Sequence, residues 1–142
     1  MAHAGQEMRA PDGFTLRLVR TATETGGALL EMEASYPGTG VLPPEHLHPQ
    51  QVERFEVLEG SVRAVIAGEE RRYDAGEAFE IPAGMPHQMT ADAPSRMRWE
   101  VRPAMRTAEF FERLYAAAAG GPGGQSIPEL LDEFSPEFRL TA

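Results

Sequence analysis

The residues best suited to chemistry lie in two short segments framed by glycine. Residues 40–60 have the spacing G-x5-H-x-H-x4-E-x6-G, in which the polar positions are His46, His48 and Glu53. Residues 76–87 have the spacing G-x5-P-x-G-x2-H and end on a third histidine. Three imidazoles and one carboxylate suit a divalent transition metal, namely Fe, Mn, Ni, Cu or Zn. The sequence therefore predicts a metal site.

The spacing also indicates how a β-structure would assemble this site. In a strand alternate side chains share a face, so His46 and His48 point into one cavity. Glu53 returns to that cavity after a Pro-Gln-Gln bend. His87 follows a Pro/Gly turn, from which an adjacent strand brings it beside the first pair. We expect all four residues to be metal ligands.

Two points about the polar residues stay open. Glu53 either binds the metal directly or supports an imidazole through a hydrogen bond, and we expect direct binding. Gln50 and Gln51 either contact a metal-bound water or cap the bend after the histidine pair, and we expect the cap. Gly60, Gly76 and Gly84 are expected at tight corners where a side chain does not fit.

The elements that position these residues are predicted to be strands. Short apolar runs separated by Gly and Pro turns are typical of an all-β sandwich or barrel. The expected strands are residues 14–20, 28–36, 53–58, 62–67, 71–74, 78–82, 87–90 and 96–102.

The chain changes character after Pro103. Residues 107–119 are helix formers with an apolar stripe, after a possible N-cap at Thr107. Gly and Pro at 120–124 predict a flexible break, and Ser126 to Glu129 fits a capping box. We expect this tail to pack on the barrel or across a dimer and to lie outside the site, so that deleting 126–142 leaves the metal bound.

Composition excludes several classes of chemistry. The chain of 142 residues has no Cys, and its 13 basic residues are all Arg, so thiolate, Schiff-base and P-loop chemistry are absent. A net charge of −9 argues against nucleic acid as a partner. No apolar stretch approaches the ~20 residues of a membrane span, and we expect a cytoplasmic protein. No serine lies in a glycine-flanked elbow, which argues against a serine hydrolase.

The two spacings resemble the two signature motifs of the cupin superfamily. The resemblance covers residues 40–87 and extends by strand count to about 28–102. It implies a conserved β-barrel or jelly roll, often a homodimer, with a metal held by the residues matching His46, His48, Glu53 and His87. The sequence departs from the second motif at Ala91, where the family commonly has Asn, so the turn after His87 is expected to be supported differently.

Strand alternation predicts the walls of the cavity. Phe55 and Val57 share the parity of Glu53 and face inward, whereas Arg54 and Glu56 face outward. Glu80 and Glu100 are likewise expected to face solvent. Phe79, Ile81 and Met97 are further candidates for the wall. The residues expected to line the pocket are Phe55, Met89 and Trp99.

The resulting domain organisation is a leader, a barrel and a tail. Residues 1–13 are expected to be a flexible leader, 14–104 a single cupin β-barrel, and 105–142 a short helical extension. The leader is too short for a DNA-binding domain, which argues against a DNA-binding sensor. The expected partners are a small-molecule ligand and a second copy of the chain.

The function stays open between several classes. The first hypothesis is a dioxygenase-like enzyme in which the metal activates a bidentate enol, catechol or flavonol. The second is a Lewis-acid isomerase, epimerase or polyketide-cyclase-like cupin, for which Zn suffices. The third hypothesis is a non-catalytic cupin that binds metal or small molecules. The fourth is a dimeric scaffold with a vestigial site. No catalytic residue beyond the metal site is identified.

Overall fold

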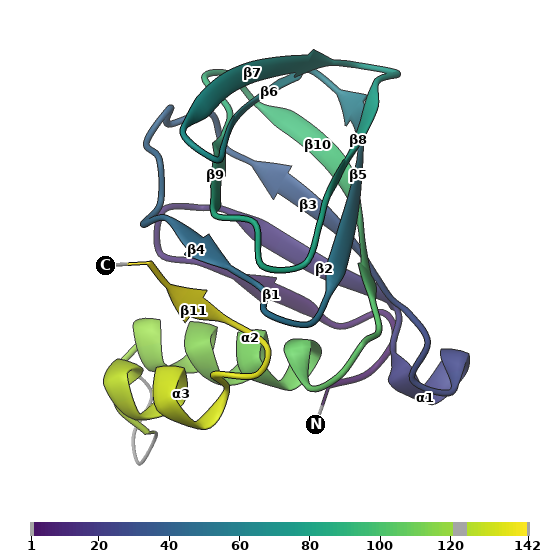
Figure 1. Ribbon diagram of the computed structural model, residues 1–142, viewed down its shortest axis with the longest axis vertical. Helices are drawn as coiled ribbons and strands as arrows, with labels where there is room; N and C mark the ends of the chain where they lie inside the picture. Colours follow the sequence, from purple (N-terminus) through teal and green to yellow (C-terminus); the bar gives the residue numbers. More distant parts are fainter. Residues whose placement is uncertain (1, 121–124, 142) are drawn as a thin grey trace.

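The computed structural model describes residues 2–120 and 125–141, and strands dominate that part of the chain (Figure 1). The strands are β1 (Glu7–Arg9), β2 (Thr15–Arg20), β3 (Leu30–Tyr36), β4 (His46–Leu47), β5 (Val52–Glu59), β6 (Ser61–Ile66), β7 (Glu69–Asp74), β8 (Ala78–Ile81), β9 (His87–Thr90), β10 (Ser95–Arg102) and β11 (Arg139–Leu140). The helices are α1 (Ala22–Thr25), α2 (Thr107–Ala118) and α3 (Ile127–Glu133). The prediction of an all-β fold with a helical tail is confirmed.

The strands form two antiparallel sheets that face each other (Figure 1). One sheet has the order β1-β2-β3-β10-β5-β8 and the other β11-β4-β9-β6-β7. Consecutive strands β5 and β6 therefore lie in different sheets, as do β8 and β9. This crossing between sheets brings the two glycine-framed segments to the same end of the barrel.

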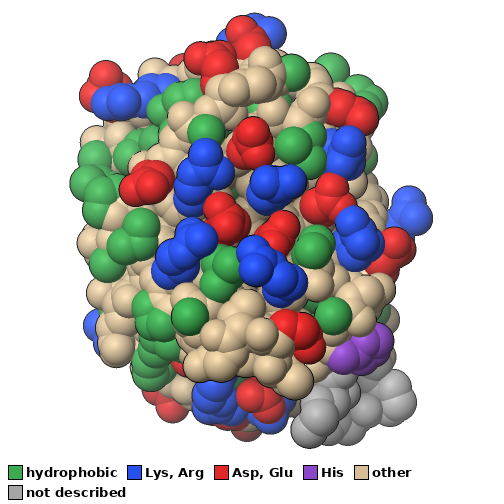
Figure 2. Space-filling view, turned by 90° about the vertical axis from the view of Figure 1, so that its right-hand side faces the viewer, with side chains coloured by type: hydrophobic (Ala, Val, Ile, Leu, Met, Phe, Trp, Pro, Cys, Tyr) green, Lys and Arg blue, Asp and Glu red, His purple; other side chains and the backbone are tan. Residues whose placement is uncertain are grey.

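Side-chain alternation on β5 separates the barrel interior from solvent. Phe55 and Val57 are buried in a cluster that the two sheets share, whereas Arg54 and Glu56 face outward. The outward residues form ion pairs across the sheet, with Arg54 3.6 Å from Glu100. Figure 2 shows basic and acidic side chains interspersed on one face of the molecule. Ion pairs of this kind on the surface contribute little to stability. The stability of this sheet therefore comes mainly from the packing of its buried face.

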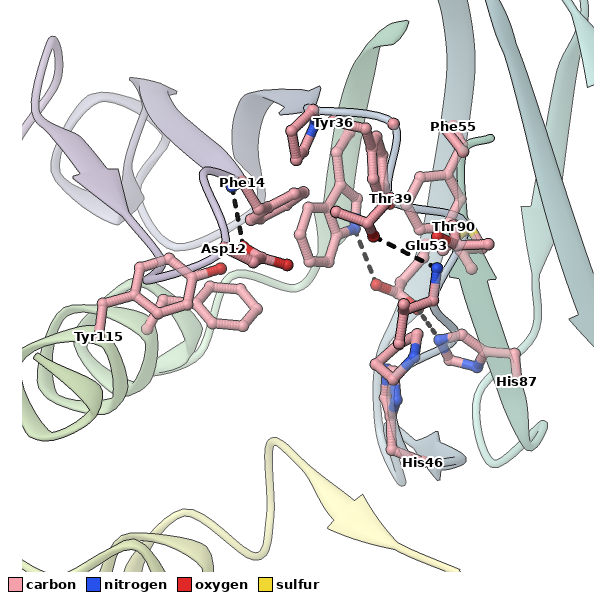
Figure 3. A pocket seen from close by; sticks show the side chains of 18 of the residues that line it. Asp12, Phe14, Tyr36, Thr39, His46, Glu53, Phe55, His87, Thr90 and Tyr115 are labelled. Carbon is pink, nitrogen blue, oxygen red and sulfur yellow. Dashed lines mark hydrogen bonds and ion pairs between the residues drawn. The ribbon is translucent and has the colours of Figure 1, made fainter. Parts of the chain in front are cut away.

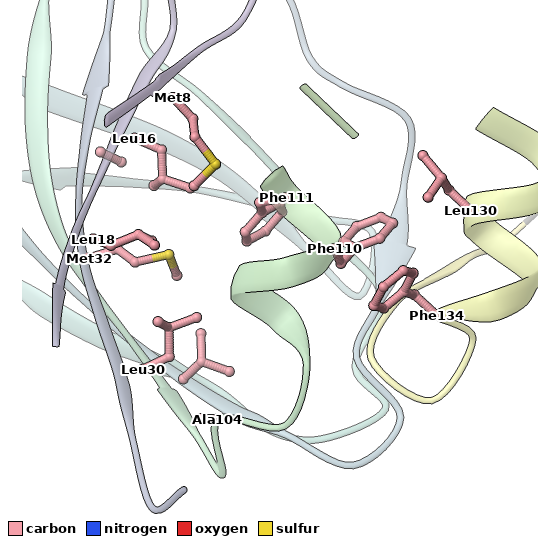
Figure 4. Close-up of a cluster of buried hydrophobic side chains, with 12 residues drawn as sticks. Met8, Leu16, Leu18, Leu30, Met32, Ala104, Phe110, Phe111, Leu130 and Phe134 are labelled. Carbon is pink, nitrogen blue, oxygen red and sulfur yellow. The ribbon is translucent and has the colours of Figure 1, made fainter. Parts of the chain in front are cut away.

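The six-stranded sheet, which contains β1, β2 and β3, is called the long sheet below. A second apolar cluster joins the helices to this sheet (Figure 4). Helix α2 places Phe110 and Phe111 against the inner side of β1, β2 and β3, and α3 adds Leu130. Ser126 accepts from the backbone of Glu129, and the Glu129 carboxylate accepts from the backbone of Ser126, so the predicted capping box is confirmed. The start of α2 differs from the prediction, because its N-cap is Arg106 and Thr107 is already helical.

The N-terminal residues also differ from expectation. Within the predicted flexible leader, 1–13, residues Glu7–Arg9 form β1 and pair with β2. Met8 is buried in the cluster under α2, which explains why this short segment is held. The expected flexible break at 120–124 falls almost wholly on residues 121–124, outside the described part of the chain.

None of the helices in the described residues has the length and apolar character that crossing a membrane requires.

Candidate metal centre

The structure brings the four predicted ligands together from three strands and one loop. His46 lies on β4 directly opposite His87 on β9, while His48 follows β4 and Glu53 lies on β5. The candidate ligand atoms of the three histidines all lie within 4.8 Å of one another. This cluster is compatible with a bound metal ion.

Glu53 completes the cluster from the opposite sheet. Its Oε1 lies 3.1 Å from Nε2 of His48. The same oxygen lies 3.0 Å from Nε2 of His87 (Figure 3). Its other oxygen, Oε2, accepts a hydrogen bond of 2.8 Å from Nε1 of Trp99 on β10. The carboxylate is 1% exposed, so one oxygen is held by the protein and the other faces the imidazoles.

Backbone carbonyls fix the orientation of all three rings. Nδ1 of His48 lies 2.8 Å from the carbonyl oxygen of Glu137, and Nδ1 of His87 lies 2.8 Å from that of Met85. Nδ1 of His46 lies 3.2 Å from the carbonyl oxygen of Pro44. A carbonyl only accepts, so each Nδ1 is the donor and a neutral ring carries a lone pair on Nε2. This is the arrangement that orients histidine ligands in metal sites.

When the rings are neutral, the inward-facing atoms are therefore hydrogen-bond acceptors without a donor. Nε2 of His48, Nε2 of His87 and Oε1 of Glu53 are buried and have no hydrogen-bond partner. Two lone pairs at 3.0–3.1 Å repel each other unless a cation or a proton lies between them. These nitrogen and oxygen atoms are therefore suitable ligands for a divalent transition metal.

The charge of the cluster follows from burial and from mutual contacts. Burial and the neighbouring imidazoles lower the pKa of His46 to about 4, so this ring is neutral at pH 7. Burial disfavours a charged His48, but the Glu53 carboxylate outweighs it and raises the pKa of His48. Burial opposes ionisation of Glu53 as well, yet contacts with His48 and His87 lower the pKa of Glu53. These contacts therefore favour the ionised form of the Glu53 carboxyl at pH 7.

A cavity of about 200 Å³ opens beside the cluster, bounded in part by His46, Glu53 and His87. The residues predicted to line the pocket, Phe55, Met89 and Trp99, all lie on its wall. The other candidates for the wall do not line it and instead lie in the barrel core: Phe79, Ile81 and Met97.

The C-terminal tail belongs to the site, contrary to the expectation from the sequence. Phe138 stacks on the His46 ring, with centroids 4.6 Å apart and planes 20° from parallel. Strand β11 pairs with β4, and Leu140 lies opposite His46. The Glu137 carbonyl that holds His48 comes from the same segment. No local motif marks these residues, since their contacts span about ninety positions of sequence.

The aromatic and acidic residues at the outer end of the cavity could not be recognised from the sequence. Asp12, Phe14, Tyr36 and Tyr115 line it, together with Phe111. Alternation along β3 marks Tyr36 only as a residue near the end of a strand. Asp12 lies in a segment that was expected to be flexible, so no pattern linked it to the metal ligands.

A backbone hydrogen bond supports the segment after His87, where the sequence departs from the second motif at Ala91. Ala91 is buried, and its carbonyl oxygen accepts a hydrogen bond of 2.9 Å from the backbone nitrogen of Gly40. The segment after His87 is thereby tied to the start of the first motif without a side-chain amide.

Comparison with solved structures gives many similar folds at low sequence identity. KdgF from Halomonas sp. has a TM-score of 0.61 at 21% identity, over 69% of this chain and 86% of that chain. An RmlC-like cupin from Shewanella frigidimarina NCIMB 400 has a TM-score of 0.63 at 16% identity, over 72% and 87%. Ectoine synthase from P. lautus has a TM-score of 0.60 at 16% identity, over 76% and 77%. At these identities the likeness shows the fold alone.

The family comparison agrees with the two glycine-framed motifs. Among curated proteins, none matches this sequence. The family model described as a cupin domain matches residues 32–101, which include all four clustered residues. The two antiparallel sheets form the jelly roll expected from the resemblance. This chain belongs to the cupin superfamily.

Proposed function

We propose that the protein is a metal-dependent, dioxygenase-like enzyme that acts on a bidentate enol, catechol or flavonol. The observation that carries the proposal is the set of buried acceptors at the centre of the cluster. Nε2 of His48, Nε2 of His87 and Oε1 of Glu53 converge without a donor, which a divalent metal would satisfy.

The proposed ligands are Nε2 of His46, His48 and His87 together with Oε1 of Glu53. Because Trp99 occupies the other carboxylate oxygen, Glu53 would bind through one oxygen. Three neutral imidazoles and one carboxylate leave a divalent ion with a net charge of +1, which favours an anionic oxygen ligand. Four protein ligands in an octahedral shell leave two positions for a bidentate substrate, or for substrate and O₂.

The chain's own residues bind and shield the substrate. The aromatic rings on the cavity wall favour a flat apolar molecule and keep water from the metal. A metal in this site would acidify the bound hydroxyl of the substrate and, if redox-active, mediate electron transfer to O₂. Both atoms of O₂ enter the product of a dioxygenation, so the reaction needs no external reductant.

One feature of the cavity favours a second candidate, a Lewis-acid isomerase or cyclase. Tyr36 lines the cavity, and burial together with the nearby Glu53 charge raises the pKa of its hydroxyl. The hydroxyl therefore stays protonated and is available as a hydrogen-bond donor to a substrate oxygen. Such a reaction needs neither O₂ nor a redox-active metal.

Turnover distinguishes these functions. Protein reconstituted with Fe, Mn, Ni, Cu or Zn in turn would be incubated with enols, catechols and flavonols, and O₂ uptake and products would be followed. The proposal predicts O₂ consumption with a redox-active metal and none in the Glu53→Ala variant. Rearrangement without O₂ uptake would instead support the Lewis-acid candidate. Binding without any turnover would indicate a small-molecule-binding cupin.

A further inference from the structure

The cavity beside the metal centre has a second polar end. Figure 3 shows Asp12 and Tyr115 on one side and Glu53, His46 and His87 on the other. The ring of Phe14 lies beside Asp12 and contacts those of Tyr36 and Tyr115 edge-on, with centroids 5.0 Å and 6.5 Å away. A ligand that is bound at the metal and extends along the cavity would therefore meet a carboxylate and aromatic rings at its far end.

The charge along this wall has one sign. Among the described residues that line the cavity, Asp12 and Glu53 are the charged side chains and no Arg is present. The chain has no Lys either, as all 13 basic residues are Arg. On the cavity wall itself, a carboxylate or phosphate at the outer end of a ligand would find no cation and would lie near Asp12, which is unfavourable.

Asp12 is held so that it presents an open oxygen. Its Oδ1 accepts a hydrogen bond of 3.0 Å from the backbone nitrogen of Phe14, and the described residues give Oδ2 no partner. Burial, Tyr36 and Asp12 raise the pKa of Tyr115, so its hydroxyl stays protonated beside the carboxylate. A carboxylate flanked by aromatic rings is a combination that binds ammonium groups, through ion pairing and cation–π attraction.

We propose that the ligand of this cavity is a cationic amine that carries an oxygen pair for the metal, such as an amine-bearing catechol or enol. The oxygen pair binds at the histidine cluster and the ammonium group binds at Asp12 among Phe14, Tyr36 and Tyr115. This inference rests on the proposed function, because it uses the metal as the anchor of the ligand.

Three catechols whose side chains are cationic, neutral and anionic provide the test. Dopamine, 4-methylcatechol and 3,4-dihydroxyphenylacetate would be titrated anaerobically into Zn²⁺-loaded protein, and Kd would be measured by calorimetry. We expect dopamine to bind about threefold to tenfold more tightly than 4-methylcatechol, as partly exposed ion-pair and cation–π contacts allow. We expect 3,4-dihydroxyphenylacetate to bind most weakly.

Two matched variants separate the role of Asp12 from general electrostatics. Asp12→Asn is expected to remove the advantage of dopamine and to leave the Kd of 4-methylcatechol unchanged. Asp132 is an exposed acid on α3 outside the cavity, and Asp132→Asn makes the same change in net charge. This variant is expected to alter neither the advantage of dopamine nor the Kd of 4-methylcatechol.

The outcomes also distinguish the two proposals. If all three catechols bind with equal affinity, or if the acid binds best, the amine assignment is overturned and the metal anchor stands. Persistence of the dopamine advantage in Asp12→Asn overturns it as well. If none of the catechols binds to protein that holds Zn²⁺, catechols are removed from the substrates of the proposed function and this inference is overturned with them.

Discussion

Nδ1 of His48 donates a hydrogen bond of 2.8 Å to the main-chain carbonyl oxygen of Glu137, which lies 89 residues further along the chain. The next residue, Phe138, stacks on the ring of His46. The C-terminal segment thus orients two of the three imidazoles in the cluster. Residues that orient a metal-binding histidine affect metal affinity even though they do not touch the metal.

Truncation of this segment is expected to weaken metal binding. A chain ending at Ser135 keeps α3 and the buried Phe134 but loses the carbonyl that holds His48. We predict a rise in the Kd for Zn²⁺ of about 10-fold to 100-fold, with a β-rich circular dichroism spectrum. This reverses the expectation from the sequence that removing 126–142 leaves the metal bound. Phe138→Ala should show a smaller rise, and Leu140→Ala, at an exposed position, should show none.

Trp99 is expected to act on the metal through Glu53. Trp99→Phe keeps an aromatic ring on the cavity wall but removes the donor to Oε2 of Glu53. We predict a loss of about 1–3 kcal/mol in the free energy of unfolding of the metal-free protein and weaker Zn²⁺ binding by at least about tenfold. A double-mutant cycle with Glu53→Gln checks that Trp99 affects metal binding through Glu53. If Trp99→Phe weakens binding equally in both backgrounds, the two residues are not coupled.

The glycine corners are expected to differ in their tolerance of a side chain. Gly60 and Gly84 have φ angles of +78° and +77°, so alanine is strained at both by about 1–2 kcal/mol. At Gly60 an added Cβ would also lie 2.3 Å from Oγ of Ser95, whereas nothing lies within 4 Å at Gly84. We predict that Gly60→Ala destabilises the protein more, by an additional ~1–3 kcal/mol. Chemical denaturation measures both variants, and equal losses would contradict the crowding seen at Gly60.

Gln51 is expected to support the fold and not the metal. Its buried Nε2 donates to the carbonyl oxygens of Pro103 and Ala104 and to Oγ1 of Thr107, which ties the bend after the histidine pair to α2. Gln51→Glu would set a buried carboxylate against these carbonyls. We predict a loss of about 3 kcal/mol or more in the free energy of unfolding. Gln50→Glu, at an exposed position, is the control and should change stability by less than about 0.5 kcal/mol.

The parts of the site that depend on local spacing could be predicted from the sequence. His46 and His48 are two residues apart at the end of a strand, so alternation alone places them together. The register of β5 likewise predicts that Phe55 faces inward and Arg54 outward. The Pro/Gly turn before His87 likewise predicted that an adjacent strand brings this residue beside the first pair.

The remaining parts depend on contacts between distant segments that carry no local signal. Glu137 and Phe138 reach the site only because α2 and α3 pack on the long sheet and return the chain to β4. Asp12 lies before β2 in a segment whose composition suggested flexibility, and burial of Met8 under α2 holds it. Tertiary packing of this kind is invisible to periodicity, because neither segment is patterned for its partner.

The homodimer and the cytoplasmic location expected from the sequence stay predictions. A sedimentation measurement on the full chain checks the first, and a single species at the monomer mass would contradict it.

The proposed function requires that His46, His48, Glu53 and His87 hold a divalent transition metal. Elemental analysis of protein purified without an affinity tag tests it most directly, beside the His46→Ala/His87→Ala double variant. We predict about one transition-metal ion per chain in the wild-type protein, or after its reconstitution, and none in a folded double variant. Protein that takes up no metal on reconstitution, or a double variant that keeps it in full, would show that these residues do not form a metal site.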